Sequence, residues 1–561
     1  MESRVLGRWG AGAVALALAL TACGGSSGDK GGSASASSGT SGSTAAAPAK
    51  DGGVVSINLS EPQFLSPGQV NETNGSEVLD ALFTGLVKYD QDNKAVLTDL
   101  ADSIESTDNK TWDIKIKPGW TFHDGTPVTA KSFVDAWNWA AYGPNGALNA
   151  YFFGPDAVGI QGYDDLQPAK EGATPKAKEM SGLKVVSDTE FTVTLVKPSN
   201  VFKTALGYTA FYPLPQAFFT EGEKKFQEAP IGNGPFKMSG SWVHNQLIKV
   251  VRYDQYAGAT KPHVAEIDYK MYKAAETAYN DLTAGSLDIL TQIPPSDLTR
   301  AKSDLGDGYQ EDPSSYYAFL GFPTFDPMYQ DINVRKAISM SIDRATIGKT
   351  VFQGTRVPAD DFVAPVIPGY RQGACGELCT YDPAKAKQYW AAAKNKPTSV
   401  TLTYNADGGH KEWIDASCNF VKKSLGVGCV GKPAPDFATL LNNLDKAKKT
   451  KASFGAFRLG WIMDYPSAQD YLGPLYSSKG SSNYYGYNNP AFDALVNKGT
   501  QETSDDAAIK DWQDAGDILA KDAPIAPMFF GASQVGFDTS KVANVRVDPY
   551  QKVDKFALTV K

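Results

Sequence analysis

Several stretches of the chain alternate apolar and polar residues with the period of a β-strand. The segment from Thr111 to Lys117, TWDIKIK, places every second side chain on one face, which predicts a strand. Residues 183–196 repeat the pattern on both sides of Ser187 and Asp188, which predicts a β-hairpin. The first part of the chain therefore contributes paired strands.

Other stretches have the 3.6-residue period of amphipathic helices. The segment PVTAKSFVDAWNWA predicts a helix with Thr129 as its N-cap, and DINVRKAISMSIDRATIGKTVF predicts a helix that breaks near Met340 to Ile342. HKEWIDASCNFVKKSLG and YNNPAFDALVNKG predict two more. Strands and helices are mixed throughout without an internal repeat, so we expect an α/β fold in which any additional domain is interleaved.

The N-terminus has a third pattern. Arg4 and Arg8 precede a short apolar run that ends in small residues, which predicts a secretory signal peptide over residues 1–22. The run is too short to span a bilayer as a mature helix. Leu20-Thr21-Ala22-Cys23 resembles a bacterial lipobox, in which cleavage leaves a lipidated Cys23 at the new N-terminus. An ordinary secretory cleavage site followed by a cysteine is the alternative.

Residues 23–53 are rich in Gly, Ser and Ala and have almost nothing to bury. Such a segment predicts a flexible tether with an r.m.s. reach of roughly 30 Å. We therefore expect an extracytoplasmic protein that is anchored by the lipid on Cys23 to the outer face of the cell membrane.

The composition argues against several classes of function. The formal charge of −8 is spread without a basic run, which argues against a nucleic-acid partner. The four histidines have no metal-binding spacing, so we expect neither a catalytic metal nor a cofactor. No nucleophile motif lies between a predicted strand and a predicted helix, which disfavours a secreted hydrolase.

Four cysteines remain after Cys23: Cys375, Cys379, Cys418 and Cys429. Disulfides are the default outside the membrane, and four cysteines allow three pairings. We favour the two local pairs, because Cys418 lies on a predicted helix whose chain returns as a strand around Cys429. A four-cysteine zinc site is the alternative.

Five stretches occur in an order that resembles the extracytoplasmic solute-binding proteins of family 5, and most closely their oligopeptide-binding lipoproteins, which serve peptide ABC transporters. They begin with LTDLADSIESTDNKTWDIKIKPGWTFHDGTPVTAKSFVDAW and IGNGPFKMSGSWVHNQLIKVVRYDQYAG. DINVRKAISMSIDRATIGKTVFQGTRVPA follows, then LGWIMDYPSAQDYL with YYGYNNPAFDALV, and last LAKDAPIAPMFF. The resemblance covers nearly all of residues 54–561.

The resemblance implies a type II periplasmic-binding-protein-like fold with two lobes and three domains. The first domain would be discontinuous, formed by residues 54–83, 212–312 and 532–561. The second would be an insertion over residues 84–211, and the third would span residues 313–531.

It also implies a site. The Trp-x-x-Asp stretch of the third domain would line the cleft, with Asp464 receiving the α-ammonium of a peptide and with Gly460, Trp461 and Ile462 supplying backbone and wall. A carboxylate is the expected partner for a buried ammonium. The alternative is that Asp464 caps a helix that begins near Pro466.

Cations would meet the carboxylate of the peptide. Arg458, His410 and Lys449 match such positions, where the family often has an arginine in place of Lys449. The alternatives are a solvated strand residue for Arg458, a helix-start residue for His410 and a solvated charge run for Lys449. On the opposite wall, the resemblance implies main-chain contacts at Asn71 and Thr73 and an aromatic contact at Tyr151. The alternative for Asn71 is that it only stabilises a turn in its loop.

The sequence thus predicts a monomeric, lipid-anchored receptor without enzymatic activity that binds short peptides and delivers them to the membrane permease subunits of an ABC importer. The alternatives within the family are other solutes: dipeptides, nickel chelates, haem or oligosaccharides. The alternatives of another class are a secreted hydrolase and a surface signalling lipoprotein.

Overall fold

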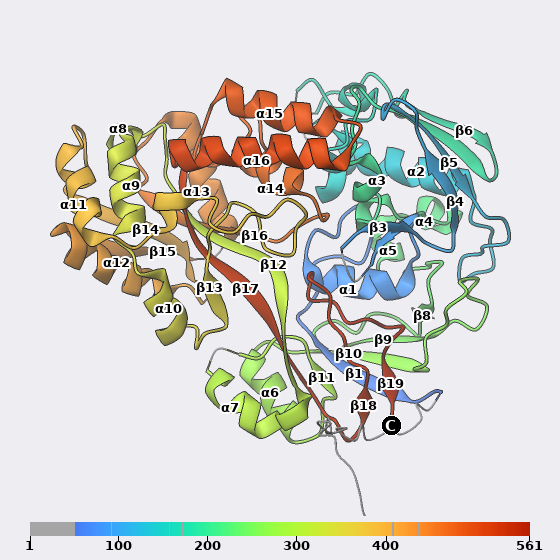
Figure 1. Cartoon of the computed structure of the whole chain (residues 1–561). Coiled ribbons are helices and arrows are strands. Elements are labelled where there is room, and N and C mark those ends of the chain that lie inside the picture. The colour runs from blue at the N-terminus through green and yellow to red at the C-terminus, as the bar shows by residue number, and fades with distance from the viewer. Residues whose placement is uncertain are drawn as a thin grey trace, which may run out of the picture. The chain divides into compact units, whose positions relative to one another are not determined.

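Figure 1 shows a computed structural model of the chain, which divides into two units, Met1–Ala47 and Pro48–Lys561. The structure describes residues 51–561 except residues 91, 92, 156, 171, 295, 407, 408 and 436. The predicted signal peptide, the lipidation site Cys23 and the tether up to residue 50 lie outside the described residues. Within the described part of the chain, no helix is both long and apolar enough to cross a bilayer.

One large mixed sheet of eleven strands organises the fold. Its strands, in spatial order, are β15 (Gly428–Ala434), β14 (Ser399–Asn405), β16 (Ala456–Trp461), β12 (Tyr309–Gly321), β17 (Ile525–Phe537), β11 (Ile289–Leu290), β1 (Val54–Leu59), β10 (Glu266–Met271), β9 (Leu247–Arg252) and β8 (Phe236–Met238). The eleventh strand, β13 (Arg356–Pro358), also pairs with β17.

Two long strands hold this sheet together. β12 and β17 have thirteen residues each and pair antiparallel from Tyr309 and Gly536 to Gly321 and Ile525. Figure 1 shows the pair running from the part with α9 and α12 to the part with α6 and α7. Because β12 also pairs with β16 and β17 also pairs with β11, the pair connects strands that lie far apart in the sequence.

Smaller sheets complete the β-structure. β4 (Ala101–Glu105), β5 (Thr111–Ile116), β7 (Glu190–Thr194) and β6 (Leu183–Ser187) form a four-stranded antiparallel sheet. It contains the strand predicted from Thr111 and the predicted hairpin, both of which are confirmed. The two-stranded sheets are β2 (Val87–Tyr89) with β3 (Ala95–Leu97), and β18 (Val542–Ala543) with β19 (Thr559–Val560).

The helices alternate with these strands along the chain. They are α1 (Thr73–Leu82), α2 (Ala130–Ala141), α3 (Phe202–Ala205), α4 (Gln216–Glu221), α5 (Glu223–Phe226), α6 (Ala275–Thr283), α7 (Leu298–Leu305), α8 (Pro327–Gln330), α9 (Ile332–Met340), α10 (Arg344–Thr350), α11 (Pro383–Ala392), α12 (Lys411–Leu425), α13 (Phe437–Thr450), α14 (Ala468–Tyr476), α15 (Pro490–Gln501) and α16 (Asp505–Asp522). Short 3-10 helices span Gly143–Asn145, Leu148–Phe153, Tyr163–Leu166, Thr209–Phe211, Gly306–Gly308 and Gly376–Cys379.

The four helices predicted from the sequence are confirmed. α2 begins after Thr129, whose side chain forms a capping box with Ser132. The predicted break falls between α9 and α10, where Asp343 accepts a hydrogen bond from the backbone N–H of Thr346 and starts the second helix. α12 and α15 occupy the other two predicted stretches.

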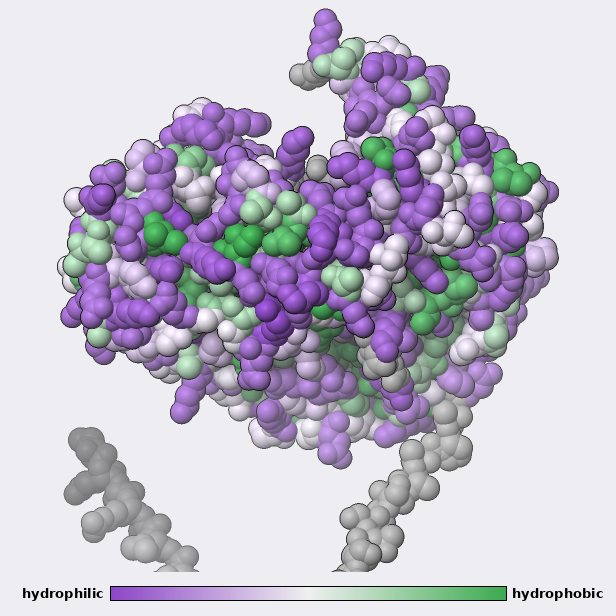
Figure 2. Space-filling view, turned by 45° about the horizontal axis from the view of Figure 1, so that its top comes forward, coloured by the Kyte–Doolittle hydropathy of each residue, from purple (hydrophilic) through white to green (hydrophobic). Residues whose placement is uncertain are grey.

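Apolar side chains between the sheet and its helices form the core. One cluster packs α9 and α12 against β12, β14 and β17, and a small cluster lies under α6 and α7. The remaining and largest cluster extends from α1 and α2 to α14 and α16. The face in Figure 2 is mainly hydrophilic, with hydrophobic residues in small separate patches. The α/β class is thus confirmed, whereas the division into three domains stays a prediction.

Both local disulfides are present. Cys375 is bonded to Cys379 at the short helix Gly376–Cys379, and Cys418 of α12 is bonded to Cys429 of β15. The second bridge ties a helix to the edge strand of the large sheet, because β15 pairs only with β14 among the described strands.

We expect the Cys418–Cys429 bridge to contribute measurably to stability. Its loop of about a dozen residues corresponds to roughly 3 kcal/mol of chain entropy in the unfolded state. The double variant Cys418→Ala, Cys429→Ala should therefore lower the free energy of urea unfolding by about that amount. The shorter loop between Cys375 and Cys379 serves as the control, since its double variant should cost about 1 kcal/mol less. A larger cost for the shorter loop would contradict the entropic account.

Candidate ligand-binding site

The candidate site starts at the end of β16, where the strand is paired on one edge only. β12 pairs with β16 from Phe457 to Trp461. β14 pairs with the opposite edge only at Ala456 and Phe457. In the part of the chain that the structure describes, that edge therefore has no strand partner from Arg458 onward, and its main chain is available to an added strand.

Asp464 lies three residues beyond this strand, in a half-buried position. Its Oδ2 accepts a hydrogen bond of 2.9 Å from the hydroxyl of Tyr151, which comes from the 3-10 helix Leu148–Phe153. The hydroxyl of Tyr550, in the C-terminal tail, donates to the Asp464 carbonyl oxygen at 3.4 Å. The structure thus brings together Asp464 and Tyr151, two residues that the sequence assigned to opposite walls of one site.

A second acid, Asp470 of α14, lies behind the first. Its Oδ2 accepts a hydrogen bond of 2.9 Å from the backbone N–H of Asp464 and one of 3.1 Å from Nε1 of Trp461. The side chain is 1% exposed, and its Oδ1 has no hydrogen-bond partner. Asp470 therefore fixes the indole and the Asp464 loop, while it adds a second carboxyl group to the site.

The surroundings disfavour negative charge on both acids. Burial raises the pKa of Asp464 to about 7, although the hydrogen bond from Tyr151 acts in the opposite direction. Burial and then the charge of Asp464 raise the pKa of Asp470 well above its ordinary range. Burial and these acids also raise the pKa values of Tyr151 and Tyr208. The folded structure therefore favours the protonated form of both acids.

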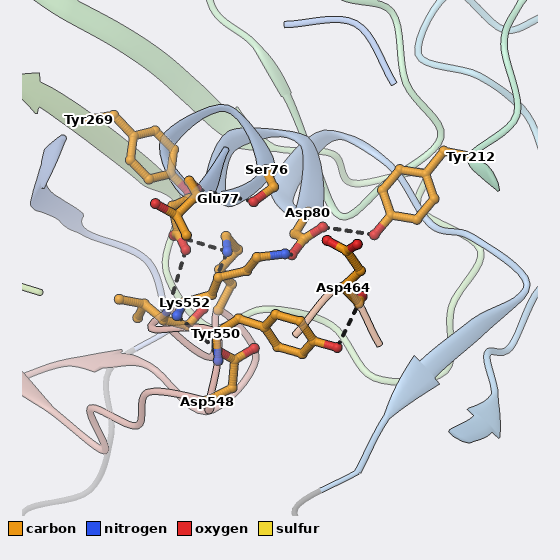
Figure 3. Close-up of polar contacts among 12 residues, drawn as sticks. Ser76, Glu77, Asp80, Tyr212, Tyr269, Asp464, Asp548, Tyr550 and Lys552 are labelled. Atoms are coloured by element: carbon orange, nitrogen blue, oxygen red, sulfur yellow. Dashed lines mark hydrogen bonds and ion pairs between the residues drawn. The ribbon is translucent and has the colours of Figure 1, made fainter. Parts of the chain in front are cut away.

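No basic side chain among the described residues pairs with Asp464 or Asp470. The nearby lysines are bound to other acids: Lys552 lies 2.6 Å from Asp80 of α1, and Lys555 lies 3.0 Å from Glu77. Figure 3 shows Lys552 pointing toward Asp80 while Tyr550, two residues earlier, points toward Asp464. The acid pair is therefore open to a cation from outside the chain.

The helix-cap alternative for Asp464 is wrong. The N-cap of α14 is Ser467, whose Oγ accepts a hydrogen bond from the backbone N–H of Gln469. Asp464 precedes that cap by three residues and directs its carboxylate toward Tyr151. Its position therefore has no explanation in helix capping.

Basic groups gather around Arg458, which lies on β16 three residues before Trp461. Arg458 is 8% exposed and donates to Asn405 Oδ1 at 2.9 Å and to the hydroxyl of Tyr316 at 3.2 Å. Arg356 of β13 donates to the same hydroxyl at 3.2 Å. His410 is 5% exposed, and burial, followed by the charges of Arg458 and Arg356, lowers its pKa to about 2. A neutral histidine and two arginines thus lie together, and the alternative of a solvated Arg458 is wrong.

The remaining predicted residues are not joined to this cluster. Lys449 is exposed in the last turn of α13. The residue of that helix that lies near Arg458 is Phe437, twelve residues earlier. Twelve helical residues correspond to about 18 Å along the axis. Asn71 and Thr73 are exposed beside Glu72, the N-cap of α1. Roles for these three residues in ligand binding stay predictions.

Sequence reasoning missed four residues of the site: Asp470, Tyr550, Tyr316 and Arg356. Asp470 had a signal, because it is a second acid within the same apolar stretch, WIMDYPSAQDYL. No signal in the sequence indicated Tyr550 or Arg356, because the C-terminal tail carries Tyr550 to the site and β13 carries Arg356 there. Among the described residues, no group of three or more His, Cys, Asp or Glu side chains is placed to hold a metal ion.

Comparison with known proteins defines the class. The model of a family described as "Bacterial extracellular solute-binding proteins, family 5 Middle" matches residues 95–483. The oligopeptide-binding protein OppA of Bacillus subtilis is 28% identical over 494 residues, which cover 85% of this chain and 87% of that protein. The periplasmic oligopeptide-binding protein OppA of Escherichia coli is 26% identical over 486 residues, with the same coverage of both chains.

A solved structure shows the same fold. The murein tripeptide binding protein MppA of Escherichia coli superimposes with a TM-score of 0.75 at 24% identity and covers 91% of this chain and 99% of its own. The fold is therefore that of the type II periplasmic binding proteins, as the sequence predicted. The chain belongs to family 5 of the bacterial extracellular solute-binding proteins.

The acid pair makes a prediction about stability and pH. The raised pKa values mean that the folded state holds these protons more tightly than the unfolded state does. The pair thus stabilises the fold most below the ordinary aspartate pKa of about 4, and that stability is lost as pH rises to about 7. We expect Asp470→Asn, which removes one ionisable group, to raise the free energy of urea unfolding at pH 8.

Asp288→Asn is the matched control. Asp288 is also buried, but its carboxylate accepts hydrogen bonds from Ser56 and Lys541. These bonds outweigh the effect of burial and leave the pKa of Asp288 lowered. The control variant should therefore lose stability at pH 8. Equal losses in the two variants would show that Asp470 is compensated like Asp288.

Proposed function

We propose that this protein is an extracytoplasmic receptor that binds short peptides along the free edge of β16. The observation that carries the proposal is the buried pair Asp464 and Asp470, which has no cationic partner among the described residues and lies at the end of that edge. A peptide supplies an α-ammonium for the acids and a main chain for the strand edge.

The positions of the charges support an extended ligand. Arg458 and Asp464 lie on the same stretch of chain, and the three residue steps of strand from Arg458 to Trp461 correspond to roughly 10 Å. Gly460 lies between them, where a Cβ atom would come within 3.3 Å of Arg458 Nη2 and of the Tyr316 ring. The lack of a side chain there keeps the approach to the strand open. Trp461 and Ile462 complete the wall in this proposal.

The relatives supply the class of ligand. The three relatives described above are named as oligopeptide-binding and murein tripeptide binding proteins, which supports peptides over the other solutes of the family. In this proposal the site recognises the main chain and the charged termini, which all peptides share. We therefore expect little selectivity for the side chains of the peptide. The proposed role is binding, with no bond made or broken.

Anchoring and delivery belong to the same proposal. Lipid on Cys23 would hold the protein at the outer face of the membrane, and a permease of an ABC importer would receive the peptide. A monomer is sufficient, because the residues that form the site come from one chain.

The ammonium assignment is tested by combining a protein variant with a modified peptide. Breaking a buried ion pair costs roughly 3 to 5 kcal/mol, so Asp464→Ala should weaken the binding of a free peptide by about two to three and a half orders of magnitude. N-acetylation of the peptide should weaken its binding to the parent by a similar factor. The two losses should not add, because they remove opposite halves of one interaction.

Isothermal titration of the four combinations gives the answer. Ser467→Ala is the control: loss of the α14 cap should cost about 1 kcal/mol of stability and leave the effect of acetylation unchanged. Fully additive losses for Asp464→Ala and acetylation would rule out Asp464 as the ammonium site.

The anchor is tested separately. Cys23→Ser should release the protein from membranes and leave its thermal unfolding unchanged, because the lipid would lie beyond the predicted tether. Membrane fractionation in high salt, with the parent as reference, measures the release. A variant that still sediments with membranes would contradict lipid anchoring without affecting the peptide-binding proposal.

A further inference from the structure

The long strand β12 has an irregularity beside the candidate site. Its pairing with β17 loses register between Pro313 and Tyr317, so the residues between these two leave that strand pair. On its other edge, β12 pairs with β16 as far as Tyr317 and Trp461. Continuing this antiparallel pairing by two residues places Ser315 opposite Met463, where the regular ladder has ended. The irregularity thus places a serine next to the loop that follows β16.

Ser315 is fully buried, and its polar groups are bonded on several sides. Its Oγ accepts a hydrogen bond of 3.4 Å from the backbone N–H of Met463 and donates one of 3.1 Å to the Pro549 carbonyl oxygen. Its backbone N–H donates to the same carbonyl oxygen at 3.1 Å, and its own carbonyl oxygen accepts from the hydroxyl of Tyr471 at 2.5 Å. The Ser315 hydroxyl thus links the residue that precedes Asp464 to the C-terminal tail.

The tail contacts the same loop at the next residue as well. Tyr550 follows Pro549, and its hydroxyl donates to the Asp464 carbonyl oxygen. Asp548 closes the turn that contains Tyr550, because its Oδ1 accepts hydrogen bonds of 2.9 Å from the N–H groups of Tyr550 and Lys552. Two neighbouring residues of the tail are therefore linked to two neighbouring residues of the loop.

Buried ion pairs hold the tail on α1. Lys552 lies 2.6 Å from Asp80, and Lys555 lies 3.0 Å from Glu77. Glu77 also accepts a hydrogen bond of 3.2 Å from the backbone N–H of Val553. Figure 3 shows both acids on α1, beside the segment that carries Lys552. Because breaking a buried ion pair is costly, the tail is a fixed support for the loop that it contacts.

We infer that Ser315 is a positioning residue of the ligand site, which holds the Asp464 loop on the C-terminal tail so that the carboxylate meets the ammonium of the ligand. The inference rests on the proposed function and extends it to a residue that is buried behind the site. Ser315 acts through Asp464: its hydroxyl restrains the backbone at Met463, and the position of that backbone determines where the carboxylate lies. Tyr550 supports the same loop through the second link.

The test compares a free peptide with its N-acetyl form in the full-length protein by isothermal titration. Ser315→Ala removes the hydroxyl that connects the loop to the tail, so it should weaken the binding of the free peptide by about three- to tenfold. Binding of the acetylated peptide should be unchanged, because this peptide has no ammonium for Asp464. A general loss of structure would instead weaken both peptides alike.

Tyr550→Phe is a second variant, which keeps the ring that stacks on Tyr89. It should act in the same direction by a smaller factor, because its bond to the Asp464 carbonyl oxygen is long, at 3.4 Å. If Ser315→Ala does not fold, Tyr550→Phe makes the same comparison.

A double variant tests whether Ser315 acts through Asp464. When Asp464→Ala is already present, Ser315→Ala should have no further effect on the free peptide. Ser341→Ala is the matched control, because it removes an equally buried hydroxyl that bonds to the Ile338 carbonyl oxygen at the end of α9. This control should keep the parent's ratio of the two affinities.

Hydrogen exchange provides a measurement that needs no ligand. In the absence of peptide, the segment that contains Met463 should exchange faster in Ser315→Ala than in Ser341→Ala, as followed by mass spectrometry. Unchanged exchange would overturn the inference, and so would an unchanged ratio of affinities or an equal weakening of both peptides in Ser315→Ala. If the parent itself does not prefer the free peptide, the ammonium assignment of the proposed function is wrong, and the inference falls with it.

Discussion

Ionisable side chains that lack a partner of opposite charge among the described residues are the constraint on which this site depends. A buried carboxylate or guanidinium without a counter-ion costs several kcal/mol, and proteins normally remove that cost by pairing the charge. Here the acids at residues 464 and 470 bond to Tyr151 and Trp461, and the arginines at residues 356 and 458 bond to Tyr316, with no ion pair to another described residue. In the proposed function, a peptide with charge at both ends would supply the missing partners.

The rest of the fold keeps this arrangement from collapsing. The C-terminal tail brings Lys552 and Lys555 close to the site but commits both to acids of α1. The same tail supplies Tyr550, which bonds to the main chain of the Asp464 loop and stacks on Tyr89 at 5.7 Å. Asp470 also holds that loop, because its carboxylate accepts a hydrogen bond from the backbone N–H of Asp464. The Asp464 loop is thus held through its main chain, while its carboxylate bonds to the neutral hydroxyl of Tyr151.

The fold could be predicted from local patterns wherever those patterns were strong. The strand at Thr111, the Thr129 cap and the bridge between Cys418 and Cys429 depend on neighbouring residues, so periodicity and spacing identified them. Asp464 was identified because the residues around it, LGWIMDYPSAQDYL, resemble a stretch of the family. Arg356 was not found, since only the pairing of β13 with β17 carries it to Tyr316, and no local pattern specifies a pairing across about 170 residues.

Hydrogen bonds also connect α15 to segments that lie far from it in the sequence. Asn200 donates from its N–H to the Thr500 carbonyl and from Nδ2 to the Gly499 carbonyl, and Asn109 donates to the Glu502 carbonyl. These acceptors lie in the last turn of α15 and at its C-cap, where the Gly499 carbonyl also accepts from the Glu502 N–H and water can satisfy the other carbonyls. Each such bond contributes about 1 kcal/mol net. A few exchangeable bonds of this size contribute little to the position of these segments, whereas in the proposed function the pairing of buried charges with a ligand would contribute several kcal/mol.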